Sequence, residues 1–311
     1  MPVVVKADGL AAGKGVFVCD DRAAALAALD SLAGDGQFAD ATKGILVEER
    51  LDGIEVSVMA ITDGRTIVTL PPLQDHKAAH DGDSGPNTGG MGAYCPAPFV
   101  DAEMLADIEA RILVPTAHAM RRAKVPFHGV LYAGLMLTSQ GPKVLEFNAR
   151  FGDPECEALM IRLESSLLEL LDAAVDRRLE SVQPPRWLDG ASVTVVMASE
   201  GYPGPVQKGR VIRGLDAAAK VPDVEVFHAA TRAIDGSVQS DGGRVLAVTA
   251  FGPSLARAKL QAYSAVKEIR WLGAWCRKDI SDKGLARERE LLASEASAQG
   301  AASDPAAEEP A

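Results

Sequence analysis

The chain has 311 residues and a net charge of −11, with 47% hydrophobic and 24% charged residues, which is typical of a globular protein of two domains. This negative charge argues against general binding to nucleic acids or anionic membranes, because their phosphates require a positive partner. The four cysteines are far apart and no apolar run is long enough to span a membrane, so we expect a cytoplasmic protein without a zinc site or disulfides.

The chain opens with a short strand that runs into a glycine-rich loop. Residues 3–5 are three valines, typical of a strand buried on both faces, and residues 8–15 contain three glycines. Their spacing fits neither the P-loop nor the GxGxxG pattern, so the loop alone indicates no more than a tight turn. Lys6, however, is unusual at the end of an all-valine strand and is well placed to bind nucleotide phosphates.

Residues 20–32 predict a helix, and residues 44–51 and 55–64 predict two strands. Carboxylates gather where these two strands meet. One interpretation is a solvated acidic corner. The other is a linker whose backbone pairs with an adenine edge while a carboxylate binds ribose hydroxyls. The carboxylates concerned are Glu48, Glu49 and Glu55.

Residues 71–98 are rich in proline and glycine, so we expect an irregular loop, and a loop of this length in a compact domain is usually functional. Its segment GPNTGGMG, residues 85–92, presents backbone N–H groups at unhindered glycines and could bind an anion. Asp75 and Lys77 are either acid/base groups or part of a polar surface. His76 lies between them, and we assign it no catalytic role because such a histidine is more often an ordinary surface residue.

Two helices and two strands are predicted next. Residues 101–124 have apolar residues at helical spacing, with a kink expected at Pro115. Residues 129–137 and 143–150 indicate adjacent strands, and residues 164–179 indicate an amphipathic helix.

Glu146 and Asn148 lie two residues apart on the second of these strands, so both side chains project from one face. A carboxylate and an amide oxygen suit Mg²⁺, which takes a few protein oxygens together with substrate phosphates. The alternative is an exposed glutamate followed by a turn-forming asparagine. The strand otherwise looks buried, and a buried carboxylate needs a cation or hydrogen-bond donors, which favours the metal site.

The second part of the chain begins at a Pro-rich break, residues 183–187, that we interpret as a domain boundary. Short strands and turns follow, with a helix over about residues 254–269. From about residue 291 the sequence becomes an acidic, low-complexity tail, for which we expect disorder.

Six stretches occur in sequence order in the first part of the chain: VVVKADGLAAGKGV, LVEERLDGIEVSV, LQDHK, GDSGPNTGGMGAYCPAP, GVLYAGLML and VLEFNARFGDPE. The second part adds GYPGPVQKG, VFHAAT, GGRVLAVTAFG and WCRKDI. In this order they resemble the ATP-grasp fold and, more narrowly, the phosphoribosylamine–glycine ligases. The resemblance implies an α+β fold with two α+β subdomains clasping ATP in residues 1–183, a small mostly-β C-terminal domain in residues 184–290, and the tail in 291–311.

The resemblance implies a reaction in which ATP phosphorylates the carboxylate of glycine and the amine of 5-phosphoribosylamine attacks the glycyl phosphate. It assigns catalysis to Asp75, Lys77 and Arg150, and Mg²⁺ or Mn²⁺ binding to Glu146 and Asn148. The residues that it implies for ATP are Lys6, Gly13, Lys14, Gly15, Glu48, Glu49, Leu51 and Glu55, and those for the substrates are Asn87, Thr88, Gly89, Gly90, Met91, Arg150 and Asp153.

The sequence departs from the family pattern at Ala78, Ala230 and Val206, and above all at its beginning. Members of the family carry an α/β amino-terminal domain first, which is expected to contribute to the phosphoribosylamine pocket. Its absence would leave a sheet edge exposed to self-association. Two alternatives follow: an inactive fragment that binds Mg-ATP, and an ATP-grasp ligase for another carboxylate. The LQDHK and GPNTGGMG stretches argue against the second.

Overall fold

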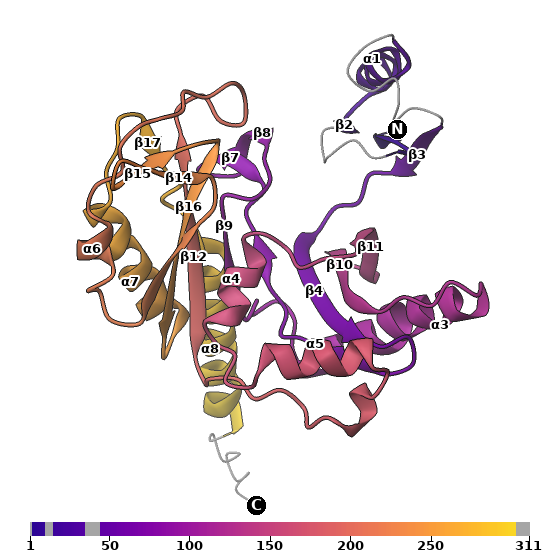
Figure 1. The fold of residues 1–311 in the computed structure, drawn as a ribbon. Helices are drawn as coiled ribbons and strands as arrows, with labels where there is room; N and C mark the ends of the chain where they lie inside the picture. Colours follow the sequence, from indigo (N-terminus) through magenta and orange to yellow (C-terminus); the bar gives the residue numbers. More distant parts are fainter. Residues whose placement is uncertain (1, 10–14, 35–43, 303–311) are drawn as a thin grey trace, which may run out of the picture.

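The protein was analysed as a computed structural model, which describes residues 2–9, 15–34 and 44–302 (Figure 1). Its first unit is an antiparallel sheet in the order β2-β1-β3, with α1 packed on it. Asp21 begins the helix by accepting a hydrogen bond from the N–H of Ala24, so the helix predicted for residues 20–32 is confirmed. The elements are β1 (Val3–Ala7), β2 (Val16–Cys19), α1 (Arg22–Ala33) and β3 (Ile45–Glu49).

The second unit is a four-stranded antiparallel sheet in the order β11-β10-β4-β5. Alternate residues of β4 face opposite sides: Val58 packs with the α2–α3 helices, whereas Met59 packs with α4 and α5. Near Pro115, where we expected a kink, a π-helical segment, Glu109–Leu113, lies between α2 and α3. The elements are β4 (Ile54–Thr62), β5 (Ile67–Thr69), α2 (Ala102–Ile108), α3 (Val114–Arg122), β10 (Gly129–Thr138), β11 (Gly141–Asn148), α4 (Glu155–Met160) and α5 (Leu167–Val175).

The third unit is a six-stranded sheet whose main path is β13-β16-β12-β9-β6, with β17 also paired to β12. Its long central strands, β12 and β16, are buried along nearly their whole length, and α7 packs on them. The elements are β6 (Gln74–Asp75), β9 (Gly92–Cys95), β12 (Ala191–Ser199), α6 (Leu215–Ala218), β13 (Val224–His228), β16 (Arg244–Gly252), α7 (Leu255–Glu268) and β17 (Ala274–Trp275). A separate two-stranded sheet is formed by β14 (Thr231–Ile234) and β15 (Ser237–Ser240).

The segment 71–98 is not the irregular loop that its composition predicts. It forms β6 and β9, together with a hairpin of β7 (Ala78–His80) and β8 (Ser84–Asn87). These strands have two to four residues each, too few to leave a period in the sequence, and β9 is held by pairing with β12. The parts of the chain before and after residue 184 therefore share one sheet, which the predicted boundary does not anticipate.

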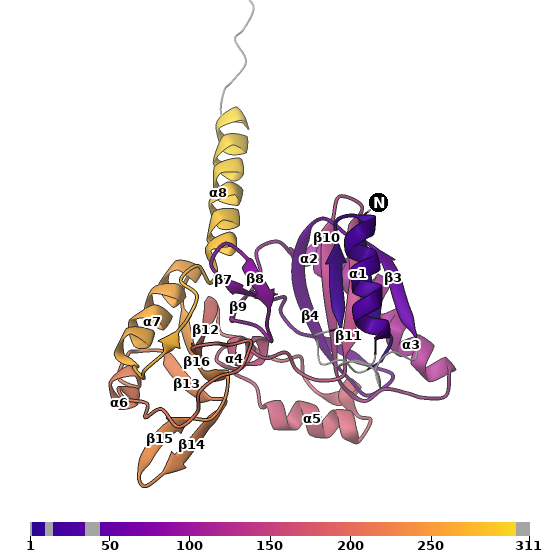
Figure 2. The same ribbon diagram turned by 90° about the horizontal axis from the view of Figure 1, so that it is seen from above.

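The last helix, α8 (Asp282–Ala302), extends well beyond residue 291, where we expected disorder to begin (Figure 2). The prediction is wrong for residues 291–302, because the alanine, leucine, glutamate and glutamine of this segment are strong helix formers even in a low-complexity sequence. Residues 303–311 lie outside the described part of the chain. None of the helices in the described part has the length and apolar content that a membrane span requires.

Candidate functional site

One end of one face of the four-stranded sheet carries polar side chains, among them Glu55, Ser57 and Glu146. In the strand register Glu55 lies opposite Met136, and Gly134 lies between Ser57 and Glu146. Gly134 has no side chain, and a Cβ built there would lie 3.4 Å from Glu146 Cγ. Glu146 therefore packs across the face of Gly134 at ordinary van der Waals distance.

Glu146 and Asn148 are neighbours on this face, since Asn148 Nδ2 donates to Glu146 Oε1 at 3.3 Å. Their strand, β11, is not buried as we expected: it is the edge of the sheet, and Glu146, Val144 and Phe147 are exposed. The described residues contain no group of three or more His, Cys, Asp or Glu side chains suited to a metal. A pair of this kind nevertheless fits Mg²⁺, because Mg²⁺ is usually bound by one or two protein groups and by substrate phosphates.

Lys6 joins the N-terminal sheet to this edge strand. Its Nζ forms an ion pair of 2.6 Å with Glu48 Oε2 and donates to the carbonyl oxygen of Leu145 at 3.1 Å. A second bridge runs from Lys143 Nζ to Glu49 Oε1, at 2.8 Å. The structure thus brings Lys6, Glu48 and Glu49 together beside the strand that carries Glu146.

The remaining residues predicted for ATP are less fully described. Gly15 is buried, and its carbonyl oxygen accepts a hydrogen bond from the N–H of Ala7 at 2.9 Å. Leu51 is half-buried just after β3. Gly13 and Lys14 lie outside the described residues.

A cavity of about 870 Å³ opens beside Glu55, between the four-stranded sheet, the 71–98 segment and α8. Its polar wall contains several predicted site residues, but α8 also forms part of it, which the low-complexity sequence gave no reason to expect. The lining includes Glu55, Gln74, Asp75, Lys77, Asn87, Met136, Lys283, Ala286, Arg287 and Glu290.

Lys77 forms an ion pair with Glu55 at this cavity. Burial pulls the pKa of Lys77 down, but the charge and hydrogen bond of Glu55, with the charges of Asp75 and Glu146, raise the pKa above its ordinary value. Lys77 is therefore a permanent cation in the midst of three carboxylates.

The pKa of Asp75 is raised too, but for a carboxyl group this favours the uncharged form. Burial, and then the charge of Glu155, raise its pKa well above the usual range, although Lys77 partly offsets them. Its Oδ1 is buried and has no hydrogen-bond partner among the described residues. Gly90 passes directly over it, since a Cβ at Gly90 would lie 2.8 Å from this oxygen and 2.5 Å from Pro154 Cδ.

Three further residues, Ser57, Tyr132 and Glu155, form a buried hydrogen-bonded group next to the site and were not among the predicted site residues. Glu155 is only 3% exposed and accepts hydrogen bonds from Ser57 Oγ at 3.1 Å and Tyr132 OH at 2.8 Å. Burial, followed by the charge of Glu155, raises the pKa of the Tyr132 phenol, so it stays a donor. The only signal in the sequence was the position of Glu155 directly after the Gly-Asp-Pro turn.

The loop 88–91 does not present the free N–H groups that an anion would need. The N–H of Thr88 donates to Lys77 O, that of Gly89 to Tyr202 OH, and that of Gly90 to Thr88 Oγ1. The N–H of Met91 donates to His76 O. Partners within the protein therefore already use the four donors, so the N–H groups of these residues are not free in this structure for the anion that the glycines suggested.

Arg244, which the sequence did not reveal as a site residue, holds this loop to the turn before α4. Its Nη1 donates to Gly89 O at 2.9 Å and to Asp153 O at 2.7 Å, and it forms an ion pair of 3.0 Å with Asp153 Oδ1. Arg150, in contrast, is exposed and donates to the adjacent Phe151 O. Asn87 is also exposed, at the end of β8.

Two family models match the chain in order. The phosphoribosylglycinamide synthetase ATP-grasp (A) domain matches residues 1–156, and the phosphoribosylglycinamide synthetase C domain matches residues 192–283. The chain belongs to the phosphoribosylglycinamide synthetase family. The resemblance and the predicted fold class, an ATP-grasp fold followed by a mostly-β part, are confirmed.

Individual relatives agree with the family models. The chain is 63% identical over 283 residues to a phosphoribosylamine–glycine ligase of Rhodopirellula baltica, and 50% identical over 288 residues to one of Brucella melitensis. These matches cover 91% and 93% of the chain but 65% and 67% of the relatives, so the chain spans about two thirds of their length.

Solved structures show the same fold. A phosphoribosylamine–glycine ligase of Thermotoga maritima is 33% identical, with a TM-score of 0.75 over 90% of this chain and 68% of that one. The biotin carboxylase domain of the Hydrogenobacter thermophilus 2-oxoglutarate carboxylase, solved with MgADP, is only 14% identical, with a TM-score of 0.65 over 88% of this chain and 58% of that one. It is similar in fold alone.

Proposed function

We propose that the chain is an ATP-dependent carbon–nitrogen ligase that joins glycine to 5-phosphoribosylamine. The γ-phosphoryl group of ATP passes to the glycine carboxylate, and the amine then displaces phosphate from glycyl phosphate to give glycinamide ribonucleotide. The observation that carries the proposal is the polar cavity of a family member, which Lys77, Glu55 and Asp75 line, with Lys6 held at the edge strand of the same sheet.

The nucleotide would lie between the N-terminal sheet and the four-stranded sheet. Lys6 and the glycine-rich loop would contact its phosphates, because the Lys6 ammonium is already held at the edge strand by Glu48 and Leu145 O. The residues proposed for ATP are Lys6, Gly13, Lys14, Gly15, Glu48, Glu49, Leu51 and Glu55.

Glu146 and Asn148 would hold a divalent cation, Mg²⁺ or Mn²⁺, with the phosphates as its other ligands. When bound, such an ion neutralises charge that develops in phosphoryl transfer. Their own contribution is to present one carboxylate and one amide group on the same face of β11.

The cavity residues would receive the substrates. Protonated Lys77 supplies a fixed positive charge for a carboxylate or an acyl phosphate, and its ion pair with Glu55 sets its position. Arg150 donates one N–H to Phe151 O, and its other N–H groups are suited to an anionic group. We propose Asp75 as a further catalytic residue, and Asn87, Thr88, Gly89, Gly90, Met91 and Asp153 as the other residues around the substrates.

Self-association through an exposed sheet edge stays a prediction. The candidate edge is β11, the outer strand of the four-stranded sheet. Val144 and Phe147 on this edge strand are 39% and 42% exposed. Sedimentation of the full chain at several concentrations tests it, and a single monomeric species at all of them would contradict it.

The decisive experiment combines the full chain with ATP, Mg²⁺, glycine and freshly made 5-phosphoribosylamine. We expect ADP and glycinamide ribonucleotide to form in equal amounts, and neither without the amine. ATP binding without amine-dependent ADP release would reject the active ligase and favour the inactive Mg-ATP-binding alternative. Turnover with a different carboxylate, but none with glycine, would favour another ligase of the same fold.

A further inference from the structure

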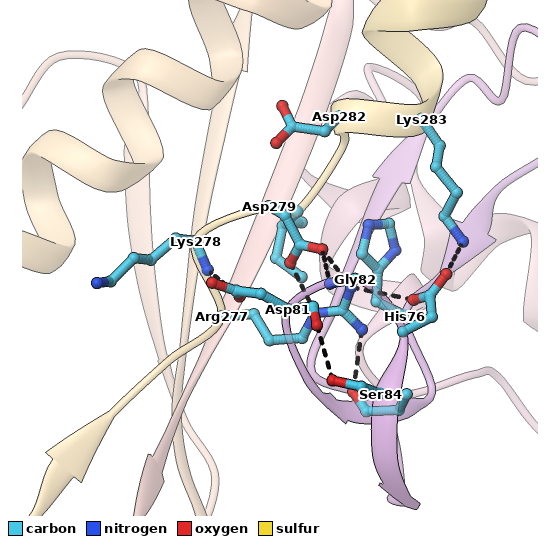
Figure 3. A network of polar contacts seen from close by, with 12 residues as sticks. His76, Asp81, Gly82, Ser84, Arg277, Lys278, Asp279, Asp282 and Lys283 are labelled. Carbon is cyan, nitrogen blue, oxygen red and sulfur yellow. Dashed lines mark hydrogen bonds and ion pairs between the residues drawn. The ribbon is translucent and has the colours of Figure 1, made fainter.

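Residues 277–283, which we call the strap, lie against residues 76–84 although about two hundred positions separate them in the sequence (Figure 3). The strap connects β17 to α8. The segment that it contacts includes His76 and most of the β7–β8 hairpin. In the sequence this hairpin lies between Lys77 and the loop 88–91.

Arg277 is the centre of this contact and is only 1% exposed. Its Nη1 donates to Ala78 O at 3.0 Å, and its Nη2 forms an ion pair of 3.0 Å with Asp83 Oδ1. Its Nε and Nη2 also donate to the two carboxylate oxygens of Asp279, at 2.8 and 2.7 Å. A buried guanidinium is tolerated only when it is paired in this way, so the hairpin and the strap depend on each other.

The tip of the hairpin is held by backbone contacts as well. The N–H of Gly82 donates to Asp279 Oδ2 at 2.9 Å, and the N–H of Lys278 donates to Asp81 Oδ1 at 2.8 Å. An ion pair of 2.5 Å joins Lys283 Nζ to Asp83 Oδ2. Figure 3 shows these groups converging on the turn of the hairpin.

His76 connects the strap to the cavity wall. It is 1% exposed, and its Nε2 accepts a hydrogen bond from the N–H of Ser281 at 3.2 Å. The carbonyl oxygen of His76 accepts from Met91, and that of Lys77 accepts from Thr88. These hydrogen bonds connect the strap to His76 and, through the backbone of residues 76 and 77, to the loop 88–91.

The hairpin has little apolar burial of its own. Ala78 and Ala79 are buried, but His80 and all of β8 are exposed. A segment with few buried apolar contacts has low local stability, so its position depends on polar contacts with the rest of the molecule. The strap supplies these contacts.

We propose that Arg277 is a positioning residue for the ligase reaction: through the strap it fixes the hairpin and thereby the placement of Asp75, Lys77 and the loop 88–91. The role in catalysis rests on the proposed function, whereas the role in fixing the hairpin does not. Arg277 lies outside the cavity lining and acts through the residues that it holds.

The test compares the full-length wild-type chain with Arg277→Met, Arg277→Lys and the milder Asp279→Asn. The matched control is Arg111→Met, which removes an exposed ion pair with Asp107 that involves neither the strap nor the hairpin. For each variant we would measure amide hydrogen exchange of residues 78–87 and of β12, the dissociation constant of ATP, and kcat/KM per folded molecule.

In Arg277→Met we expect exchange of residues 78–87 to accelerate about tenfold or more while β12 is unchanged, and kcat/KM to fall about tenfold with ATP affinity within about twofold. Arg277→Lys should restore part of both effects, and Arg111→Met should show neither. If Arg277→Met is poorly folded, Asp279→Asn should give the same pattern in weaker form.

Two results would overturn the proposal. One is hairpin exchange that stays at the wild-type rate in both Arg277→Met and Asp279→Asn. The other is a loss of activity that only follows the folded fraction, as a purely structural role predicts. A wild-type chain without ligase activity would instead reject the proposed function, and hydrogen exchange would still decide whether Arg277 fixes the hairpin.

Discussion

Arg244 and Asp153 form an ion pair of 3.0 Å that joins the first residue of β16 to the turn before α4. The same guanidinium donates to Gly89 O at 2.9 Å, so one side chain fixes both the loop 88–91 and the Asp153 turn. Two segments from the first part of the chain are thus held by an arginine from the second part.

Replacing Arg244 by lysine should lower kcat/KM about tenfold, because a single ammonium cannot reproduce the forked contacts to Gly89 and Asp153. Arg244→Ala should also lower the free energy of unfolding by about 1 to 3 kcal/mol, the usual range for a lost charged hydrogen bond. Steady-state kinetics and urea denaturation measure the two effects. The control is Arg232→Ala, which removes the more exposed pair with Asp241. Equal effects at both positions would contradict a specific role for Arg244.

Glu146→Gln should weaken the dependence of activity on Mg²⁺, because the variant keeps the shape of the side chain but loses its negative charge. We expect the Mg²⁺ concentration for half-maximal activity to rise about tenfold to a hundredfold, a range typical of damaged metal sites. A Mg²⁺ titration of the ATP-dependent rate measures this. Glu164→Gln, an exposed change outside the sheet, should behave like the wild-type chain. An unchanged Mg²⁺ titration in Glu146→Gln would reject the metal assignment.

The residues that could be predicted from the sequence are those placed by local geometry. The alternation of a strand puts Glu146 and Asn148 on one face whatever surrounds them, and both were identified. The prediction that their strand is buried was wrong, because a run of apolar residues does not reveal whether a strand is central or at the edge of a sheet. The resemblance, carried by six ordered motifs, predicted the fold class that no single motif established.

The contributions that were missed come from distant parts of the chain. Arg244 and Arg277 contact Gly89 and Ala78, segments next to the predicted site residues, across more than a hundred residues of sequence, and nothing in their local sequence distinguishes them from surface arginines. The loop 88–91 illustrates the same limit: its glycines indicated free N–H donors, but Lys77, Tyr202 and their neighbours already use them.

Gly90→Ala should damage the site through a steric clash as well as through backbone strain. Gly90 has φ of +113°, and a Cβ there would lie 2.5 Å from Pro154 Cδ. Gly141→Ala is a matched control, because Gly141 has a similar φ of +98° but no atom within 4 Å of the added Cβ. The midpoint temperature of thermal unfolding and kcat/KM should both fall further in Gly90→Ala than in Gly141→Ala. Similar losses in the two variants would attribute the effect to strain alone.

Stability should depend on pH through His76 and Glu157, whose pKa shifts act in opposite directions. Burial, with the charges of Arg277 and Lys283, lowers the pKa of His76 to about 3, so its folded form is neutral where the unfolded form is protonated. Between the ordinary value near 6.5 and about 3, the unfolded state binds more protons, and stability is lost as pH falls. Burial raises the pKa of Glu157 to about 7, so its folded state binds more protons, and stability is lost as pH rises from about 4.5 to 7.

The two contributions can be separated by substitution. Each has a limiting slope of about 1.4 kcal/mol per pH unit, so they partly cancel in the wild-type chain between pH 5 and 6.5. His76→Gln should remove the loss on acidification, and its stability relative to the wild type should improve as pH falls from 7 to 5. Glu157→Gln should show the reverse, improving relative to the wild type as pH rises from 5 to 7. Urea denaturation at pH 5, 6 and 7 measures both, and parallel profiles for all three proteins would contradict the assignment.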